Sequence, residues 1–121
     1  DHNLKASERS YVDEALGRTG REARPANYFA FDMKVQPQVS NALLLTYIGD
    51  DKNRKFDVKV EGVLIATVDW NGGTTGKFYD FEYPLPASLI EGKTTINVRI
   101  EANYERTAGR VFGCRTIKKQ E

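Results

Sequence analysis

Histidine and cysteine each occur once in this 121-residue sequence, and each scarcity excludes a class of site. A single cysteine, Cys114, cannot form an intrachain disulfide. His2 lies near the chain end, so a zinc site or a Ser–His–Asp arrangement would depend on a frayed terminus. We therefore expect Cys114 to be a small buried side chain rather than a nucleophile.

Long apolar runs and an excess of one charge are also missing. No segment approaches the roughly twenty apolar residues of a membrane helix. The sequence has 18 lysines and arginines against 17 aspartates and glutamates, interspersed except for the pair Lys118 and Lys119. A nucleic-acid surface needs a basic stripe that neutralises phosphates. We therefore expect neither nucleic acid nor a membrane as a partner.

Catalytic motifs are missing as well. The sequence has no phosphate-binding loop, dinucleotide fingerprint, nucleophile elbow or metalloprotease helix. Carboxylate pairs, which glycoside hydrolysis needs, occur only in a turn or at outward strand positions, where such groups are usually solvated or salt-bridged. We therefore predict that this chain is not an enzyme, and an independent hydrolase is a remote alternative.

The sequence is instead rich in alternating apolar and polar residues, a period of two that is typical of half-buried strands. The alternation runs through 27–35, 56–70, 77–83 and 94–102. A continuous apolar run over 42–48 indicates a central strand that is covered on both sides.

Turn signals separate these strands. Glu61 and Gly62 predict a two-residue hairpin turn, because glycine tolerates the positive φ that such turns require. Residues 87–91 indicate one helical turn, and 109–117 indicate the final strand. For the N-terminal part we expect a strand at 4–6, a helical turn at 12–16 and an ordered loop at 17–26.

About eight short strands at this spacing predict an all-β fold. We expect a jelly-roll-like antiparallel β-sandwich, with an immunoglobulin-like sandwich as the alternative. Residues 1–121 have no linker or repeat and are expected to form one domain. Because the sequence starts at Asp1 and shows no signal peptide, we expect it to be excised from a larger protein.

Aromatic residues near loops are the candidate ligand contacts. Trp70 precedes a glycine-rich loop, Tyr104 lies in the loop before the last strand, and Tyr28 follows the arginine-rich segment that contains Arg21. An exposed ring offers an apolar platform to the C–H face of a sugar, and nearby polar groups bond its hydroxyls. The alternative is that Trp70 and Tyr28 seal the edge of the core.

The only candidate metal site is a cluster of oxygen-bearing residues in one turn, made by Asp50, Asp51 and Asn53. Ca²⁺ accepts carboxylate, amide and carbonyl ligands in flexible geometry. The spacing matches no EF-hand loop, and an ordinary polar turn explains it equally well. We expect no other cofactor.

Six segments together resemble a known group of proteins: 17–23, 28–33, 46–50, 56–62, 77–86 and 108–115. In this order they resemble the C-terminal domain of bacterial glycoside hydrolases of the β-L-arabinofuranosidase-like group. In that group an upstream (α/α)₆ barrel performs the catalysis, and its glutamate and zinc-binding cysteines have no counterpart here. Gly20 departs from the group, which has an aromatic residue at this position.

The resemblance implies a non-catalytic accessory domain that packs against or positions the catalytic barrel of the same polypeptide. The alternative is a carbohydrate-binding module for plant oligo- or polysaccharide. Its candidate contacts are then Tyr28, Trp70, Tyr104 and Arg21. The parent enzyme is expected to be periplasmic or extracellular.

Overall fold

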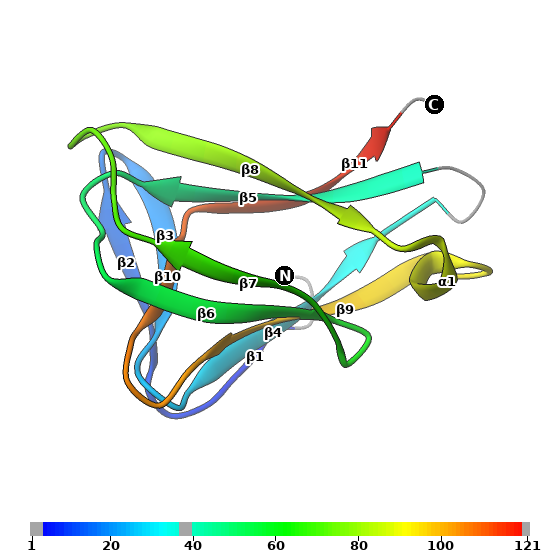
Figure 1. Cartoon of the computed structure of the whole chain (residues 1–121), viewed down its shortest axis with the longest axis horizontal. Helices are drawn as coiled ribbons and strands as arrows, with labels where there is room; N and C mark the ends of the chain where they lie inside the picture. The colour runs from blue at the N-terminus through cyan, green and yellow to red at the C-terminus, as the bar shows by residue number, and fades with distance from the viewer. Residues whose placement is uncertain (1–3, 37–39, 120–121) are drawn as a thin grey trace.

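The computed structural model describes residues 4–36 and 40–119, and strands make up most of them (Figure 1). The single helix of this part, α1, spans Ala87–Ile90. No helix within it is long and apolar enough to cross a membrane. The strands are β1 (Lys5–Ala6), β2 (Ser10–Ala15), β3 (Arg18–Ala23), β4 (Tyr28–Lys34), β5 (Ser40–Ile48), β6 (Arg54–Val60), β7 (Val63–Trp70), β8 (Phe78–Leu85), β9 (Thr95–Ala102), β10 (Ala108–Val111) and β11 (Gly113–Lys119).

Two sheets pack against each other and enclose the core. The larger sheet has the strand order β1-β4-β9-β6-β7, and the smaller has the order β11-β5-β8. A third sheet, β10-β3-β2, closes one end of the molecule (Figure 1). All neighbouring strands are antiparallel. This architecture confirms the predicted all-β antiparallel sandwich.

In the larger sheet, β4, β9 and β6 each fill the core with one face, and β7 adds Val68. In β9, for example, Ile96, Val98 and Ile100 are buried, and the residues between them are half-exposed. The smaller sheet contributes Tyr47, whose ring meets the edge of Phe56 with 5.8 Å between the ring centroids. The Tyr47 hydroxyl is hydrogen-bonded to the Tyr83 hydroxyl at 2.8 Å. Burial raises the pKa of Tyr47, so this phenol remains protonated in the core.

Strand β5 is buried on both of its faces, as the continuous apolar run predicted. Leu43 and Leu45 point into the core between the sheets. Leu44 and Thr46 point to the other face of the smaller sheet and are nevertheless buried, with exposed fractions of 9% and 3%. Other side chains must therefore cover that outer face.

The N-terminal part differs from the prediction. Residues 12–16 are not a helical turn, and of the predicted loop 17–26 only 24–26 remain outside the strands, because β2 and β3 form a hairpin. Its turn residues Leu16 and Gly17 have positive φ angles of 53° and 77°. The hairpin pairs with β10 and leaves most of β2 exposed, so no apolar alternation marks these strands. With this hairpin, and with the last predicted strand divided into β10 and β11, the described residues form eleven strands rather than about eight.

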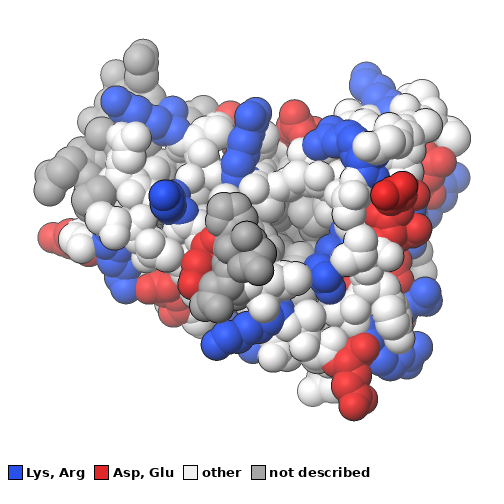
Figure 2. All heavy atoms as spheres, turned by 180° about the vertical axis from the view of Figure 1, so that it is seen from behind, with Lys and Arg blue, Asp and Glu red and all other residues white. Residues whose placement is uncertain are grey.

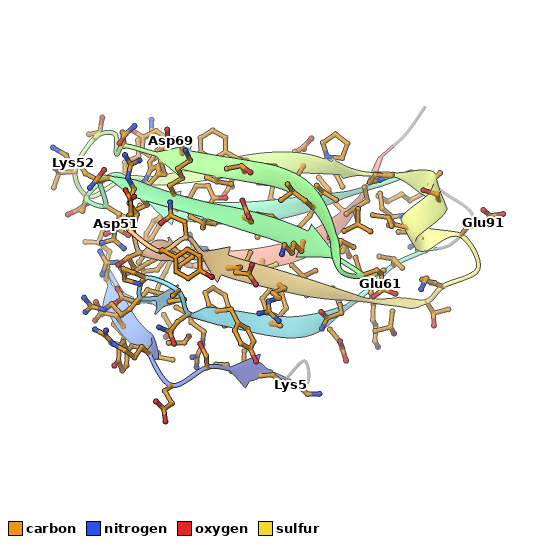
Figure 3. The ribbon with its side chains drawn as sticks, turned by 60° about the horizontal axis from the view of Figure 1, so that its bottom comes forward. Lys5, Asp51, Lys52, Glu61, Asp69 and Glu91 are labelled. Carbon is orange, nitrogen blue, oxygen red and sulfur yellow. The ribbon has the colours of Figure 1, made fainter. Side chains whose placement is uncertain are left out.

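The predicted turns at the other end are confirmed. Glu61 and Gly62 have positive φ angles of 52° and 78° and connect β6 to β7. The Glu61 carboxylate accepts hydrogen bonds from Lys93 Nζ at 2.5 Å and from the backbone N–H of Asn97 at 2.8 Å. These bonds tie the turn to the start of β9. In Figure 3, Glu61 and Glu91 lie at one end of the molecule and Asp51 and Asp69 at the other.

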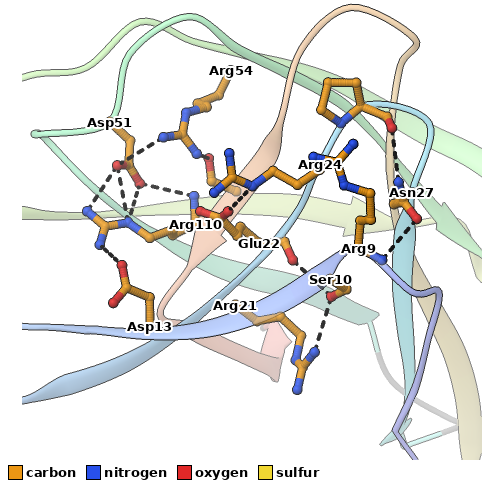
Figure 4. Close-up of polar contacts among 12 residues, drawn as sticks. Arg9, Ser10, Asp13, Arg21, Glu22, Arg24, Asn27, Asp51, Arg54 and Arg110 are labelled. Carbon is orange, nitrogen blue, oxygen red and sulfur yellow. Dashed lines mark hydrogen bonds and ion pairs between the residues drawn. The ribbon is translucent and has the colours of Figure 1, made fainter.

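A network of ion pairs joins the third sheet to the sandwich (Figure 4). Asp51, in the loop after β5, accepts hydrogen bonds from Arg110 Nε and from the Arg110 backbone N–H, both at 3.0 Å. Arg54 Nη2 approaches the same carboxylate at 3.5 Å, and Arg110 also pairs with Asp13 on β2 at 2.9 Å. The bonds to Asp51 raise the pKa of Arg110, which therefore stays charged.

Replacing Asp51 tests the contribution of this network. Its side chain is only 5% exposed, so Asp51→Asn leaves two guanidinium groups without their buried counter-charge. We expect the free energy of unfolding to fall by about 2–4 kcal/mol, measured by urea denaturation. The exposed Glu14, on the β2–β3 hairpin, is the control, and Glu14→Gln should change stability by less than about 0.5 kcal/mol. Equal midpoints for both variants would contradict this role.

Glu61 should make stability depend on pH. The hydrogen bond from Lys93 is the largest cause that lowers the Glu61 pKa, and the Asn97 N–H adds to it. A lowered pKa in the folded state stabilises the fold above about pH 4.3, the ordinary glutamate value, and this stabilisation is lost as pH falls through the lowered pKa. Glu61→Gln should therefore cost about 1 kcal/mol at pH 7, after allowance for solvent screening, and progressively less at acid pH. A cost that is the same at pH 7 and pH 2 would contradict the assignment.

Candidate functional site

The four predicted contact residues do not converge on one site. The Trp70 ring packs between Tyr47 and Tyr79 at centroid distances of 5.7 Å and 5.3 Å, and its Nε1 donates a hydrogen bond to the Ile48 carbonyl at 2.9 Å. Trp70 therefore seals the end of the core, which is the alternative that the sequence left open.

Tyr28 and Tyr104 lie elsewhere. The Arg99 guanidinium stacks over the Tyr28 ring at 3.7 Å, on the face of the larger sheet that points away from the core. Tyr104 lies in the loop between β9 and β10 and is 89% exposed. Neither of these rings, nor Trp70, borders the hollows that Gly113 and Cys114 line.

The three candidate calcium ligands also point to different partners. Asp51 is engaged by Arg110 and Arg54, whose positive charges oppose a cation at the same carboxylate. Asp50 Oδ1 accepts a hydrogen bond from the Gly76 N–H at 2.7 Å. Asn53 is exposed and has a positive φ of 58°, as a turn residue. Within residues 4–36 and 40–119, no three His, Cys, Asp or Glu side chains are grouped to hold a metal ion.

Two adjoining hollows lie on either side of strand β11 at its first residues, and they share Gly113 and Cys114. We call the pair the β11 groove. The smaller hollow, about 200 Å³, has an apolar lining that includes Phe29, Phe31 and Phe112, together with Arg21 as its one charged residue. Figure 2 shows the back of the molecule, which is hollowed near its middle and bordered there by Lys and Arg side chains.

The larger hollow, about 430 Å³, lies on the outer face of the smaller sheet. Strand pairing places Gly113, Thr46 and Asp80 side by side on β11, β5 and β8, and it places Arg115 beside Leu44 in the next outward row. These residues line the hollow together with Arg18 and Cys114. The outer face of β5 thus forms part of the lining of this hollow, and Leu44 is its apolar floor.

The polar groups of the larger hollow differ in how firmly they are held. Thr46 Oγ1 donates a hydrogen bond to Asp80 Oδ1 at 2.6 Å. The Arg18 guanidinium stacks on the Phe78 ring at 4.4 Å, and its Nη2 lies 3.5 Å from the Phe112 carbonyl. Arg115 is exposed and makes no ion pair with any residue that the structure describes.

Two glycines shape the groove. At Gly113, an added Cβ would lie 2.9 Å from Thr46 Oγ1 and 3.2 Å from Arg18 Nη2, so a side chain there would fill the larger hollow. At Gly20, an added Cβ would lie 2.7 Å from the Phe112 ring. The space that an aromatic side chain would take at Gly20 is therefore filled by Phe112, which also packs edge-on against Phe78.

Cys114 is not an activated thiol. Burial raises the pKa of the Cys114 thiol to about 12, so it is neutral at physiological pH. The groove thus presents guanidinium groups, one free carboxylate oxygen, a hydroxyl and apolar surface. These groups can bind polar ligands, but they include no nucleophile paired with a general base.

Of the groove residues, the sequence identified Arg21 and missed Arg18, Thr46, Asp80 and Arg115. Thr46, Asp80 and Gly113 meet only through the strand order β11-β5-β8, which sequence spacing does not reveal. The one available signal was the continuous apolar run of β5, because it indicated that other residues cover the outer face of this strand.

Solved structures that resemble this chain share its fold at low sequence identity. A family 35 carbohydrate-binding module from Clostridium thermocellum is 13% identical with a TM-score of 0.70, over 97% of this chain and 93% of that one. A family 6 module from Clostridium cellulolyticum, in complex with xylose, is 10% identical with a TM-score of 0.60, over 95% and 89%. An exo-β-1,3-galactanase from Phanerochaete chrysosporium is 13% identical with a TM-score of 0.73, but the match spans 95% of this chain and only 27% of that enzyme.

At such identities these likenesses establish the β-sandwich fold alone. No curated protein sequence matches the chain. The model of one protein family, described as "Family of unknown function (DUF6805)", matches residues 1–117. The chain therefore belongs to the DUF6805 family.

Proposed function

We propose that this chain is a non-catalytic, saccharide-binding accessory domain of a glycoside hydrolase, and that it binds its ligand in the β11 groove. The groove carries the proposal, because it combines an apolar floor at Leu44 with hydrogen-bonding groups at Thr46, Asp80 and Arg115. Saccharide sites need both, since the C–H faces of a sugar ring are apolar and its hydroxyls are polar.

Similar structures support this proposal, because proteins with this fold include saccharide-binding domains. Several are carbohydrate-binding modules, and others are parts of longer chains, such as a Podospora anserina β-(1,4)-mannanase of which the match spans 27%. From the sequence resemblance we further propose that the domain is part of a β-L-arabinofuranosidase-like enzyme with an upstream catalytic barrel. Export of the domain with that parent is part of the same proposal.

The binding site proposed here differs from the one that the sequence suggested. Trp70 is held by the core, and Tyr104 is an exposed ring that lines neither hollow of the β11 groove. Arg21 remains in the proposal, since it lines the smaller hollow.

Calorimetric titration with arabinan, xylan, galactan and pectic oligosaccharides tests the proposal. We expect at least one ligand to bind, and Asp80→Ala to weaken it about tenfold or more through the loss of a charged hydrogen-bond acceptor. Asp80 is exposed, so this variant should fold normally. Tyr104→Ala is the comparison and should leave the affinity unchanged. Absence of binding across the panel, or weakening by Tyr104→Ala alone, would contradict the groove as the site.

A second candidate role, contact with a catalytic barrel, is favoured by one surface. The β2–β3 hairpin exposes Tyr11, Val12 and Leu16, at 45%, 55% and 64%. Exposed apolar side chains of this size on one hairpin are candidates for a contact surface.

In the parent enzyme, Val12→Glu should therefore lower the melting temperature by a few degrees, as expected for about 1 kcal/mol. In the isolated chain the same substitution should have no effect, because Val12 is already exposed. Differential scanning calorimetry of both proteins makes the comparison. An equal shift in both, or no shift in either, would contradict this contact.

A further inference from the structure

We propose that the larger hollow of the β11 groove selects an acidic saccharide, with the carboxylate of a uronic acid residue bound by Arg115 and Arg18. This inference rests on the proposed saccharide-binding function and adds a ligand class to it. Three observations support it: the excess of arginine over acidic residues in the lining, the contacts that hold Arg18, and the mixed apolar and polar surface of the hollow.

Positive charge dominates the groove. Arg18 and Arg115 line the larger hollow against one acidic residue, Asp80, and Arg21 lines the smaller hollow without any acidic neighbour in its lining. Asp80 is already engaged at one oxygen by Thr46. On β8, Glu82 lies across Leu44 from Arg115 by strand register, and it is not part of the lining of the hollow.

The two arginines have complementary properties as ligand contacts. Stacking on Phe78 and the contact with the Phe112 carbonyl hold Arg18 in place, so little conformational entropy is lost when it binds a ligand. Arg115 is exposed, without an ion pair to any described residue, and is free to close onto a bound anion. A guanidinium group matches a carboxylate with two parallel hydrogen bonds, which gives both affinity and orientation.

The remaining surface fits the rest of a uronic acid ring. Leu44 offers an apolar floor beside Arg115. Thr46 Oγ1 can accept a hydrogen bond from a sugar hydroxyl, and the second oxygen of Asp80 can accept another. Asp80 also repels a second anion, which favours a ligand with one carboxylate per ring over a densely charged polymer.

The test compares two ligands that differ only at the carboxyl group, which is either charged or a neutral methyl ester. Trigalacturonate and its fully methyl-esterified form have the same sugar backbone, and calorimetry at about 0.15 M salt measures both affinities. We expect the acid to bind at least about tenfold more tightly than the ester. Arg115→Gln should remove most of this preference, and Arg115→Lys should retain a part of it, because lysine keeps the charge but not the paired hydrogen bonds. Arg9→Gln, at an exposed arginine outside the groove, should preserve the full preference.

Three outcomes would overturn the inference in distinguishable ways. Equal affinity for acid and ester would reject acidic selectivity and leave saccharide binding intact. Equal weakening by Arg9→Gln and Arg115→Gln, or equally tight binding of a sulfated oligosaccharide of the same charge, would show general charge attraction instead of a carboxylate site. Failure of every oligosaccharide, neutral or acidic, would reject the proposed function itself.

Discussion

Burial of β5 on both faces is the constraint on which the rest of this structure depends. The inward residues Leu43, Leu45 and Tyr47 fix the distance and register between the two main sheets through their contacts with the larger sheet. The outward residues Leu44 and Thr46 must also be kept from water, although they point away from that core. Apolar burial of this kind contributes roughly 25 cal/mol per Å², so an uncovered outer face would be costly.

The cover on that outer face is incomplete, and its gaps form the groove. Phe112 and Phe78 pack together at one end, Arg18 stacks on Phe78, and Gly20 makes room for the Phe112 ring. Beyond them, Gly113 has no side chain to fill the space above Thr46. The same packing that protects β5 thus leaves a hollow with an apolar floor and cationic walls. The Asp51–Arg110 network anchors β10, which leads directly into Phe112 and β11.

The sequence predicted the sandwich because strands such as β4, β6 and β9 bury one face each, and such strands alternate visibly. The hairpin β2–β3 was missed because neither strand alternates in this way: β2 is largely exposed, and β3 buries Gly20, Glu22 and Ala23 instead of a row of large apolar residues. The contact site was harder to predict. Trp70 and Tyr28 are aromatic residues near loops, yet one completes the core and the other stacks under Arg99. Thr46, Asp80 and Arg115 come together only through the register of three strands that are distant in sequence.

The most direct test of the account is to locate the ligand by NMR. In a titration of the ¹⁵N-labelled chain with the tightest-binding oligosaccharide, we predict the largest amide shifts at Thr46, Gly113, Cys114 and Arg115, around the start of β11. Shifts centred instead on Tyr104 and the loop between β9 and β10, with the amides of Thr46 and Gly113 unmoved, would contradict the central claim that the β11 groove is the binding site.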